Sequence, residues 1–204
     1  GVTVNSGATL ALNLVNNASF ANTIADSGTV SFTQTGGNTT TVSGAITGTG
    51  ALTQVGTGTT ILSGTNNYSG ATNVNAGTLQ VGNGSAGSIA SGSGVTVNNG
   101  ATLALNLVNN ATFANTIADS GTVSFTQTGG NTTTVSGAIT GTGALTQAGT
   151  GTTILSGTNN YSGPTSVNAG TLQVGNGSAG SIASGSGVTV NSGATLALNL
   201  VNNA

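Results

Sequence analysis

The chain repeats itself every 93 residues. The stretch GVTVNSGATLALNLVNNA begins the sequence, returns with one change 93 residues later and returns again after 186 residues. Two full copies, 1–93 and 94–186, therefore precede the first part of a third, 187–204. Such an array predicts one continuous solenoid of stacked units, and we expect the natural protein to be longer. The two full copies differ only at Ser6/Asn99, Ser19/Thr112, Val55/Ala148, Ala71/Pro164 and Asn73/Ser166.

Smaller units of strand, glycine turn and strand appear inside each copy. In the first copy the turn glycines are Gly7, Gly37, Gly58 and Gly77, and Gly100 opens the series again. These glycines lie 19 to 30 residues apart. Because glycine adopts positive φ without steric cost, we expect these four to form the corners at which the chain turns.

Apolar residues alternate with polar or small residues within these units. Val2 and Val4 flank Thr3, and Leu79 and Val81 flank Gln80. A period of two predicts half-buried β-strands, and Gly, Thr, Asn and Val all disfavour helix. The predicted structural core of the first copy consists of Val2, Val4, Leu10, Leu12, Leu14, Val30, Phe32, Leu52, Leu62, Val74, Leu79 and Val81.

A single unit buries almost nothing, so the units must stack. Parallel stacking at about 4.8 Å places Val on Val and Leu on Leu in continuous columns. A unit of about 20 residues suits one coil of an all-β, parallel β-helix, with about four coils in each 93-residue repeat. An all-antiparallel β-sandwich is the alternative, although it needs no such long repeat.

Asparagine and tyrosine are expected at the corners of the coils. Asn16 and Asn17 belong to one such group, and stacked amide ladders of the kind seen in cross-β structures are the expected role. The tyrosines are expected to cover a corner, since tyrosine is often only partly buried. The predicted corner and ladder residues are Asn66, Asn67, Tyr68, Asn159, Asn160 and Tyr161.

The composition excludes several functions. The chain has no Lys, Arg, His or Cys, and its only acidic residues are Asp26 and Asp119. Nucleic-acid binding lacks its counterion-release contribution, and no apolar run is long enough to span a membrane in this segment. Glycosidase chemistry needs two carboxyl groups within about 10 Å, and a serine nucleophile needs a base. We therefore predict no enzyme activity, no cofactor and no metal site, with each aspartate serving as a turn residue.

One stretch resembles a known family of secreted bacterial proteins. GTGALTQVGTGTTILSGTNNYSGATNVNAGTL, at 48–79, and its counterpart at 141–172 are similar to the autotransporter-associated β-strand repeat, also called the passenger-associated transport repeat. The resemblance implies a right-handed parallel β-helix outside a Gram-negative cell, within the passenger of a large adhesin. The family often carries Lys where Gln54 and Gln147 stand here.

These observations predict an extracellular, non-catalytic stalk or fibre segment of a giant repetitive autotransporter-like adhesin. The alternative is a filament or matrix subunit whose partner is a second copy, joined end to end through open strand edges or side by side. A weaker alternative is an ice-binding, threonine-rich β-helix, although coils of unequal length would spoil a regular threonine array. A lectin would need a polar groove, for which the sequence shows no cluster.

Overall fold

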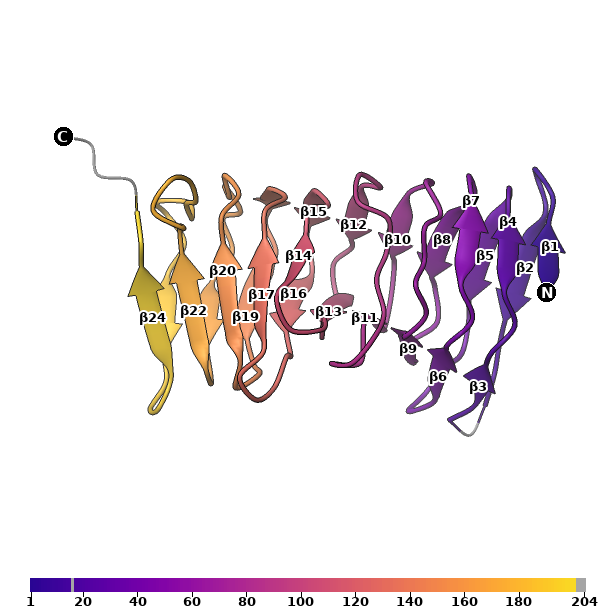
Figure 1. Cartoon of the computed structure of the whole chain (residues 1–204), viewed down its shortest axis with the longest axis horizontal. Helices are drawn as coiled ribbons and strands as arrows, with labels where there is room; N and C mark the ends of the chain where they lie inside the picture. Colours follow the sequence, from indigo (N-terminus) through magenta and orange to yellow (C-terminus); the bar gives the residue numbers. More distant parts are fainter. Residues whose placement is uncertain (16, 201–204) are drawn as a thin grey trace.

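The computed structural model describes residues 1–15 and 17–200 and contains 24 strands and no helix over those residues. Neighbouring strands pair in parallel along the long axis of the molecule, and β1 and β24 lie at opposite ends (Figure 1). The chain forms a β-solenoid of about nine turns. The predicted parallel β-helix is confirmed, and the antiparallel sandwich is excluded.

Two sheets hold the strands of one side of the solenoid. The first is β1 (Val2–Val4), β4 (Ile24–Asp26) and β7 (Ile46–Gly48), and the second is β14 (Ala111–Phe113), β17 (Thr132–Val135), β20 (Thr152–Leu155), β22 (Thr171–Val174) and β24 (Thr195–Leu198). Between them, Asn67 and Ser69 donate backbone hydrogen bonds to β7, and Thr65 forms a parallel bridge with Ser88. We call this side face A.

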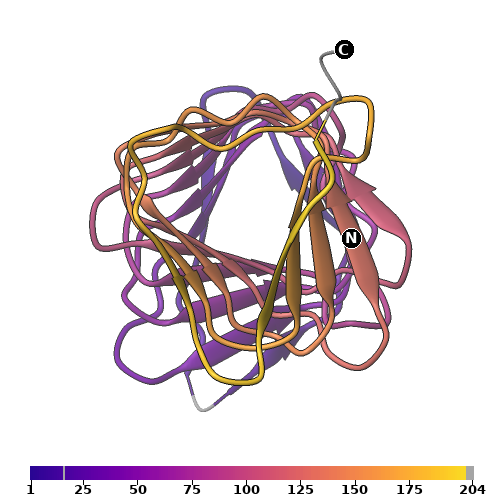
Figure 2. The same ribbon diagram turned by 90° about the vertical axis from the view of Figure 1, so that its left-hand side faces the viewer.

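Two longer sheets form the other sides. Face B contains β2 (Thr9–Leu12), β5 (Thr29–Phe32), β8 (Ala51–Gln54), β10 (Thr72–Val74), β12 (Val95–Val97), β15 (Ile117–Asp119) and β18 (Ile139–Gly141). Face C contains β3 (Ser19–Phe20), β6 (Thr39–Val42), β9 (Thr59–Leu62), β11 (Thr78–Val81), β13 (Thr102–Leu105), β16 (Thr122–Phe125), β19 (Ala144–Gln147), β21 (Thr165–Val167) and β23 (Val188–Val190). The view along the axis shows the coils stacked behind one another (Figure 2).

The repeat does not contain a whole number of coils. One copy supplies eleven strands, β1 to β11, and two short paired segments at Thr65 and Ser88. These thirteen rungs are distributed over three faces, and thirteen divided by three is four and one third. Strand β12, the second-copy equivalent of β1, accordingly stacks on β10 in face B, whereas β1 lies in face A.

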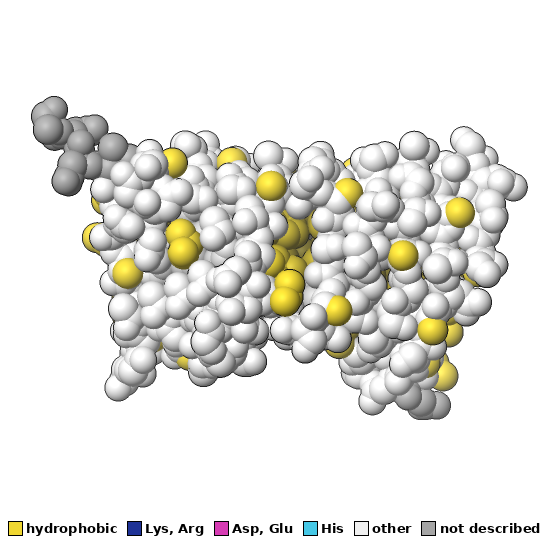
Figure 3. Space-filling model, in the orientation of Figure 1, with side chains coloured by type: hydrophobic (Ala, Val, Ile, Leu, Met, Phe, Trp, Pro, Cys, Tyr) yellow, Lys and Arg dark blue, Asp and Glu magenta, His cyan; other side chains and the backbone are white. Residues whose placement is uncertain are grey.

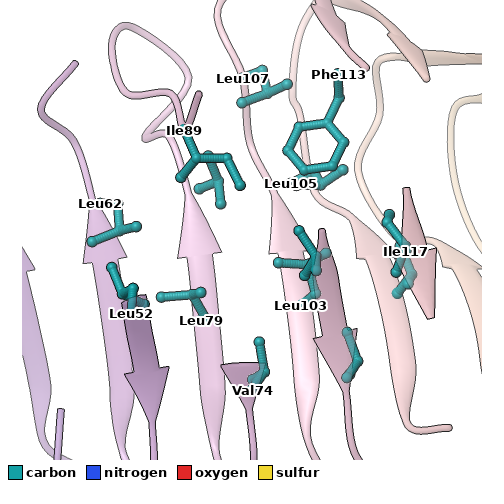
Figure 4. Packing of buried hydrophobic residues seen from close by; sticks show 14 of the residues in the cluster. Leu52, Leu62, Val74, Leu79, Ile89, Leu103, Leu105, Leu107, Phe113 and Ile117 are labelled. Atoms are coloured by element: carbon teal, nitrogen blue, oxygen red, sulfur yellow. The ribbon is translucent and has the colours of Figure 1, made fainter. Parts of the chain in front are cut away.

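The core is a column of inward-facing apolar side chains (Figure 4). Strands such as Thr78–Val81 alternate half-buried and buried residues, as a period of two requires. Parallel pairing then brings Leu79 next to Leu103 and Val81 next to Leu105. Each coil thereby covers the apolar side chains of the coil before it, which a single coil cannot do for itself.

Most of the sequence-predicted core residues lie in this column. The buried ones are Val4, Leu12, Val30, Phe32, Leu52, Leu62, Val74, Leu79 and Val81. Val2 and Leu10 are partly buried and pack against the core, and Leu14 is half-buried. Their second-copy equivalents Val95, Leu103 and Leu107 are buried, because these residues have coils on both sides.

The turn glycines differ in part from the prediction. Gly7 and Gly77 have positive φ, whereas Gly37 and Gly58 do not, and Gly36 has positive φ in place of Gly37. Gly58 is required for a different reason, since an added Cβ would lie 2.6 Å from the carbonyl oxygen of Asn38 on the preceding coil. Close stacking of coils, rather than backbone conformation, excludes a side chain there.

Candidate functional site

Each full copy buries its single carboxyl group inside the solenoid. Asp26 ends β4 and Asp119 ends β15, and each side chain is 1% exposed. Oδ1 of Asp26 accepts a hydrogen bond of 2.9 Å from the Gly28 amide, as a turn aspartate does, and Asp119 repeats this bond with Gly121. The Oδ2 atom of each has no hydrogen-bond partner among the described residues.

Burial of these carboxyl groups raises their pKa values. Loss of solvation disfavours the charged form, and the single amide hydrogen bond only partly opposes this effect. The pKa of Asp119 rises from 3.8 to about 6, and that of Asp26 also lies above its ordinary value. The sequence prediction of a turn residue is therefore incomplete, because it did not include burial.

A buried glutamine–threonine network lies beside the core in each copy. Thr60 Oγ1 donates to Gln54 Oε1 and accepts from Gln34 Nε2, both at 2.6 Å. Gln54 Nε2 donates to the carbonyl oxygens of Gly56 and Gly58. Gln54 thus uses its amide nitrogen as a donor at the position where the family often carries Lys. The second copy places Gln127, Gln147 and Thr153 in the equivalent network.

The two tyrosines lie in the interior and do not cover a corner from outside. Tyr68 and Tyr161 are fully buried, and their hydroxyl groups hydrogen-bond to Thr72 and Thr165 at 2.8 and 2.6 Å. Burial raises the pKa of both phenols. An aromatic ring in this position has no open face to offer a sugar, so stacking on a carbohydrate is not available to it.

The expected amide ladders at Asn66 and Asn159 do not form. Asn66 is buried, accepts from the Ile46 amide at 2.9 Å and donates to the carbonyl oxygens of Gly64 and Ser88. It therefore replaces backbone pairing where face A has no regular strand. Asn159 has the equivalent bonds to Ile139, Gly157 and Ser181.

The remaining predicted ladder residues are also not stacked on one another. Asn67 and Asn160 are exposed. Asn17 has a φ of 57° and accepts a hydrogen bond from the Thr39 amide, and Asn16 lies outside the described residues. Amide-to-amide contacts occur elsewhere, between Asn98 and Asn75 and between Asn191 and Asn168, each at 2.8 Å.

The outer surface carries no charged side chain over the described residues, because both aspartates are buried and the chain has no Lys or Arg. The face drawn in Figure 3 shows polar uncharged groups with scattered apolar ones. Val15 and Val108, at equivalent positions, are 56% and 44% exposed. A surface of this kind has no electrostatic means of selecting a charged ligand.

No conventional ligand site occurs in the part of the chain that the structure describes. Residues 1–15 and 17–200 contain no cluster of three or more metal-ligating side chains and no enclosed pocket. Over the same ranges no helix is long and apolar enough to cross a membrane. The outer faces and the buried polar groups are therefore the features on which a functional argument can rest.

Comparison with known proteins adds the family. The sequence model of the passenger-associated-transport-repeat matches residues 52–81 and 145–174, which run from β8 to β11 and from β19 to β22. No curated protein and no solved structure matches the chain. The repeat and the solenoid fit a passenger segment of an autotransporter, and the family implies a secreted or cell-surface bacterial protein. The chain thus carries two passenger-associated-transport repeats, one in each full copy.

Proposed function

We propose that this segment is a non-catalytic structural stalk in the passenger of an autotransporter-like adhesin of a Gram-negative bacterium. The observation that carries the proposal is the uninterrupted stacking across the boundary between copies, where β10 pairs with β12 and β11 pairs with β13. Since each copy covers the apolar end of the previous one, length can grow without new surface chemistry.

The chemistry of the side chains supports a mechanical role. The potential acid–base groups are two buried carboxyl groups in different copies and two buried phenols. Each coil advances the rod by about 4.8 Å, so a copy of four and one third coils adds about 21 Å. A stiff neutral rod of this kind would hold a binding region away from the cell surface.

Electron microscopy of the isolated protein tests the proposal. We expect separate rods whose length does not change with protein concentration, and an array with two more copies should be longer by about 42 Å. Rods that do not lengthen with added copies would contradict a stalk.

A filament or matrix role is the second candidate, and the uncharged surface favours it. Identical copies that approach one another meet no charge repulsion from side chains, because both aspartates are 1% exposed. In the same concentration series, lateral bundles or end-to-end filaments would support this role, and their assembly should depend little on salt. Single rods at every concentration would contradict it.

A further inference from the structure

Equivalent strands occupy a different face in each successive copy. The first strand of the repeat is β1 in face A, β12 in face B and β23 in face C. The second strand follows the same order, with β2 in face B, β13 in face C and β24 in face A. The shift therefore has a constant direction and a constant size of one face per copy.

The joint between copies is the same at both boundaries. Asn73 of β10 lies next to Thr96 of β12 at the first boundary, and their equivalents Ser166 and Thr189 are neighbours at the second. The hydrogen bond from Asn98 to Asn75 recurs with Asn191 and Asn168 at the same distance of 2.8 Å. Because the two full copies differ at only five positions, any copy can follow any other through this joint.

We propose that the number of copies sets the direction in which the segments beyond the array point. Each added copy advances the rod by about 21 Å and turns the next segment of the chain by a third of a turn. The original direction returns after three copies, which is thirteen coils or about 62 Å. Copy number thus changes reach and direction together, in fixed steps. The biological use of this device depends on the proposed stalk role, but the geometry does not.

The same rotation distributes outward features around the rod. The loop between β5 and β6, at 33–38, lies between faces B and C, and its equivalent at 126–131 lies between faces C and A. The tips of these loops, such as Thr35 and Thr128, are exposed. A flat partner on one side therefore meets a given loop once in three copies, whereas the array as a whole presents that loop on all sides.

Cysteine cross-linking tests the joint, because the natural chain has no cysteine. Asn73 and Thr96 face outward on neighbouring rungs, and the spacing of adjacent strands suits a disulfide. We expect Asn73→Cys with Thr96→Cys to cross-link within one chain. If the repeat held a whole number of coils, Ala104, the equivalent of Ala11, would follow Asn73 instead. Cross-linking of Asn73→Cys with Ala104→Cys, and none of the first pair, would overturn the inference. Single-cysteine variants control for cross-links between chains.

Spin-label distances in a longer array test the three-copy period. An array extended to four copies receives Thr35→Cys in its first copy and the equivalent change in one other copy. Labels in copies one and two should lie clearly farther apart than the axial advance of about 21 Å, while labels in copies one and four should lie about 62 Å apart. Distances that grow as simple multiples of about 21 Å from the first pair onward would overturn the proposal. Failure of the stalk role on cells would leave both measurements unchanged.

Discussion

A Cβ atom placed on Gly143 would overlap the carboxyl group of Asp119, and Gly50 stands in the same relation to Asp26. Each glycine lies one coil beyond its aspartate and forms a wall of the space that holds the carboxyl group. The glycine and the aspartate are therefore one structural unit, and neither can be changed without effect on the other.

Gly143→Ala should destabilise the solenoid by about 3 kcal/mol, because the new methyl group overlaps a buried carboxyl group that has no room to move. Urea denaturation followed by circular dichroism measures the change. Gly130→Ala is the matched control, since a Cβ there meets nothing within 4 Å and the φ is not positive. Its effect should stay within about 0.5 kcal/mol. Equal losses for the two variants would contradict the assigned packing.

The stability of the protein should fall as pH rises from about 3.8 to about 6. The pKa of Asp119 is about 6 in the folded chain against an ordinary value of 3.8. The folded state therefore holds its proton more tightly, and ionisation above that range costs on the order of 2–3 kcal/mol. Below pH 3.8 the carboxyl group is protonated in both states and the stability should level off.

Asp119→Asn removes this titration, so the denaturation midpoint of the variant should depend less on pH than that of the natural chain. Asp26→Asn should act in the same direction, because the pKa of Asp26 is also raised. The double variant should be nearly insensitive to pH between 3.8 and 6. A natural chain that grows more stable as pH rises through this range would show that the carboxylates are stabilised inside the fold.

Much of the fold follows from the sequence, but the number of coils per repeat does not. Alternation of apolar and polar residues identifies Leu79 and Val81 as inward-facing, and the structure buries both. Counting turn glycines gives four units, whereas rung partners lie 19 to 24 residues apart and the interval from Gly7 to Gly37 is 30. Loops of unequal length hide the three-face period, which only strand pairing reveals.

Polar residues of the site are harder to place. An aspartate in a polar, glycine-rich chain is expected on the surface, and only the glycine one coil away, Gly143 for Asp119, signals that space has been left for it. Asn66 is expected to stack on other amides, yet its partners are backbone groups of Ile46, Gly64 and Ser88. Backbone groups left without a strand partner attract such side chains, and their positions depend on tertiary structure.

Gln54→Leu should cost about 1–3 kcal/mol. The substitution keeps the side-chain volume similar but leaves the Thr60 hydroxyl and the Gly56 carbonyl oxygen buried with a lost partner. Gln80→Leu is the control, since Gln80 is half-buried and donates a hydrogen bond to the Gly82 carbonyl oxygen. The denaturation midpoint should fall more for the Gln54 variant. A similar fall for both would mean that the buried network adds nothing specific.

The two copies also provide a natural comparison at Ala71 and Pro164. Both carbonyl oxygens accept the same bond, from Leu52 and Leu145 at 3.0 Å, and neither residue donates a backbone hydrogen bond over the described residues. The backbone of the first copy therefore already suits proline, which limits the unfolded chain more than alanine does. Ala71→Pro should raise the stability by about 0.4–1 kcal/mol, and Pro164→Ala should lower it by a similar amount. Thermal unfolding of both variants beside the natural chain decides the point. A lower midpoint for Ala71→Pro would show that the loops before β10 and β21 differ in conformation.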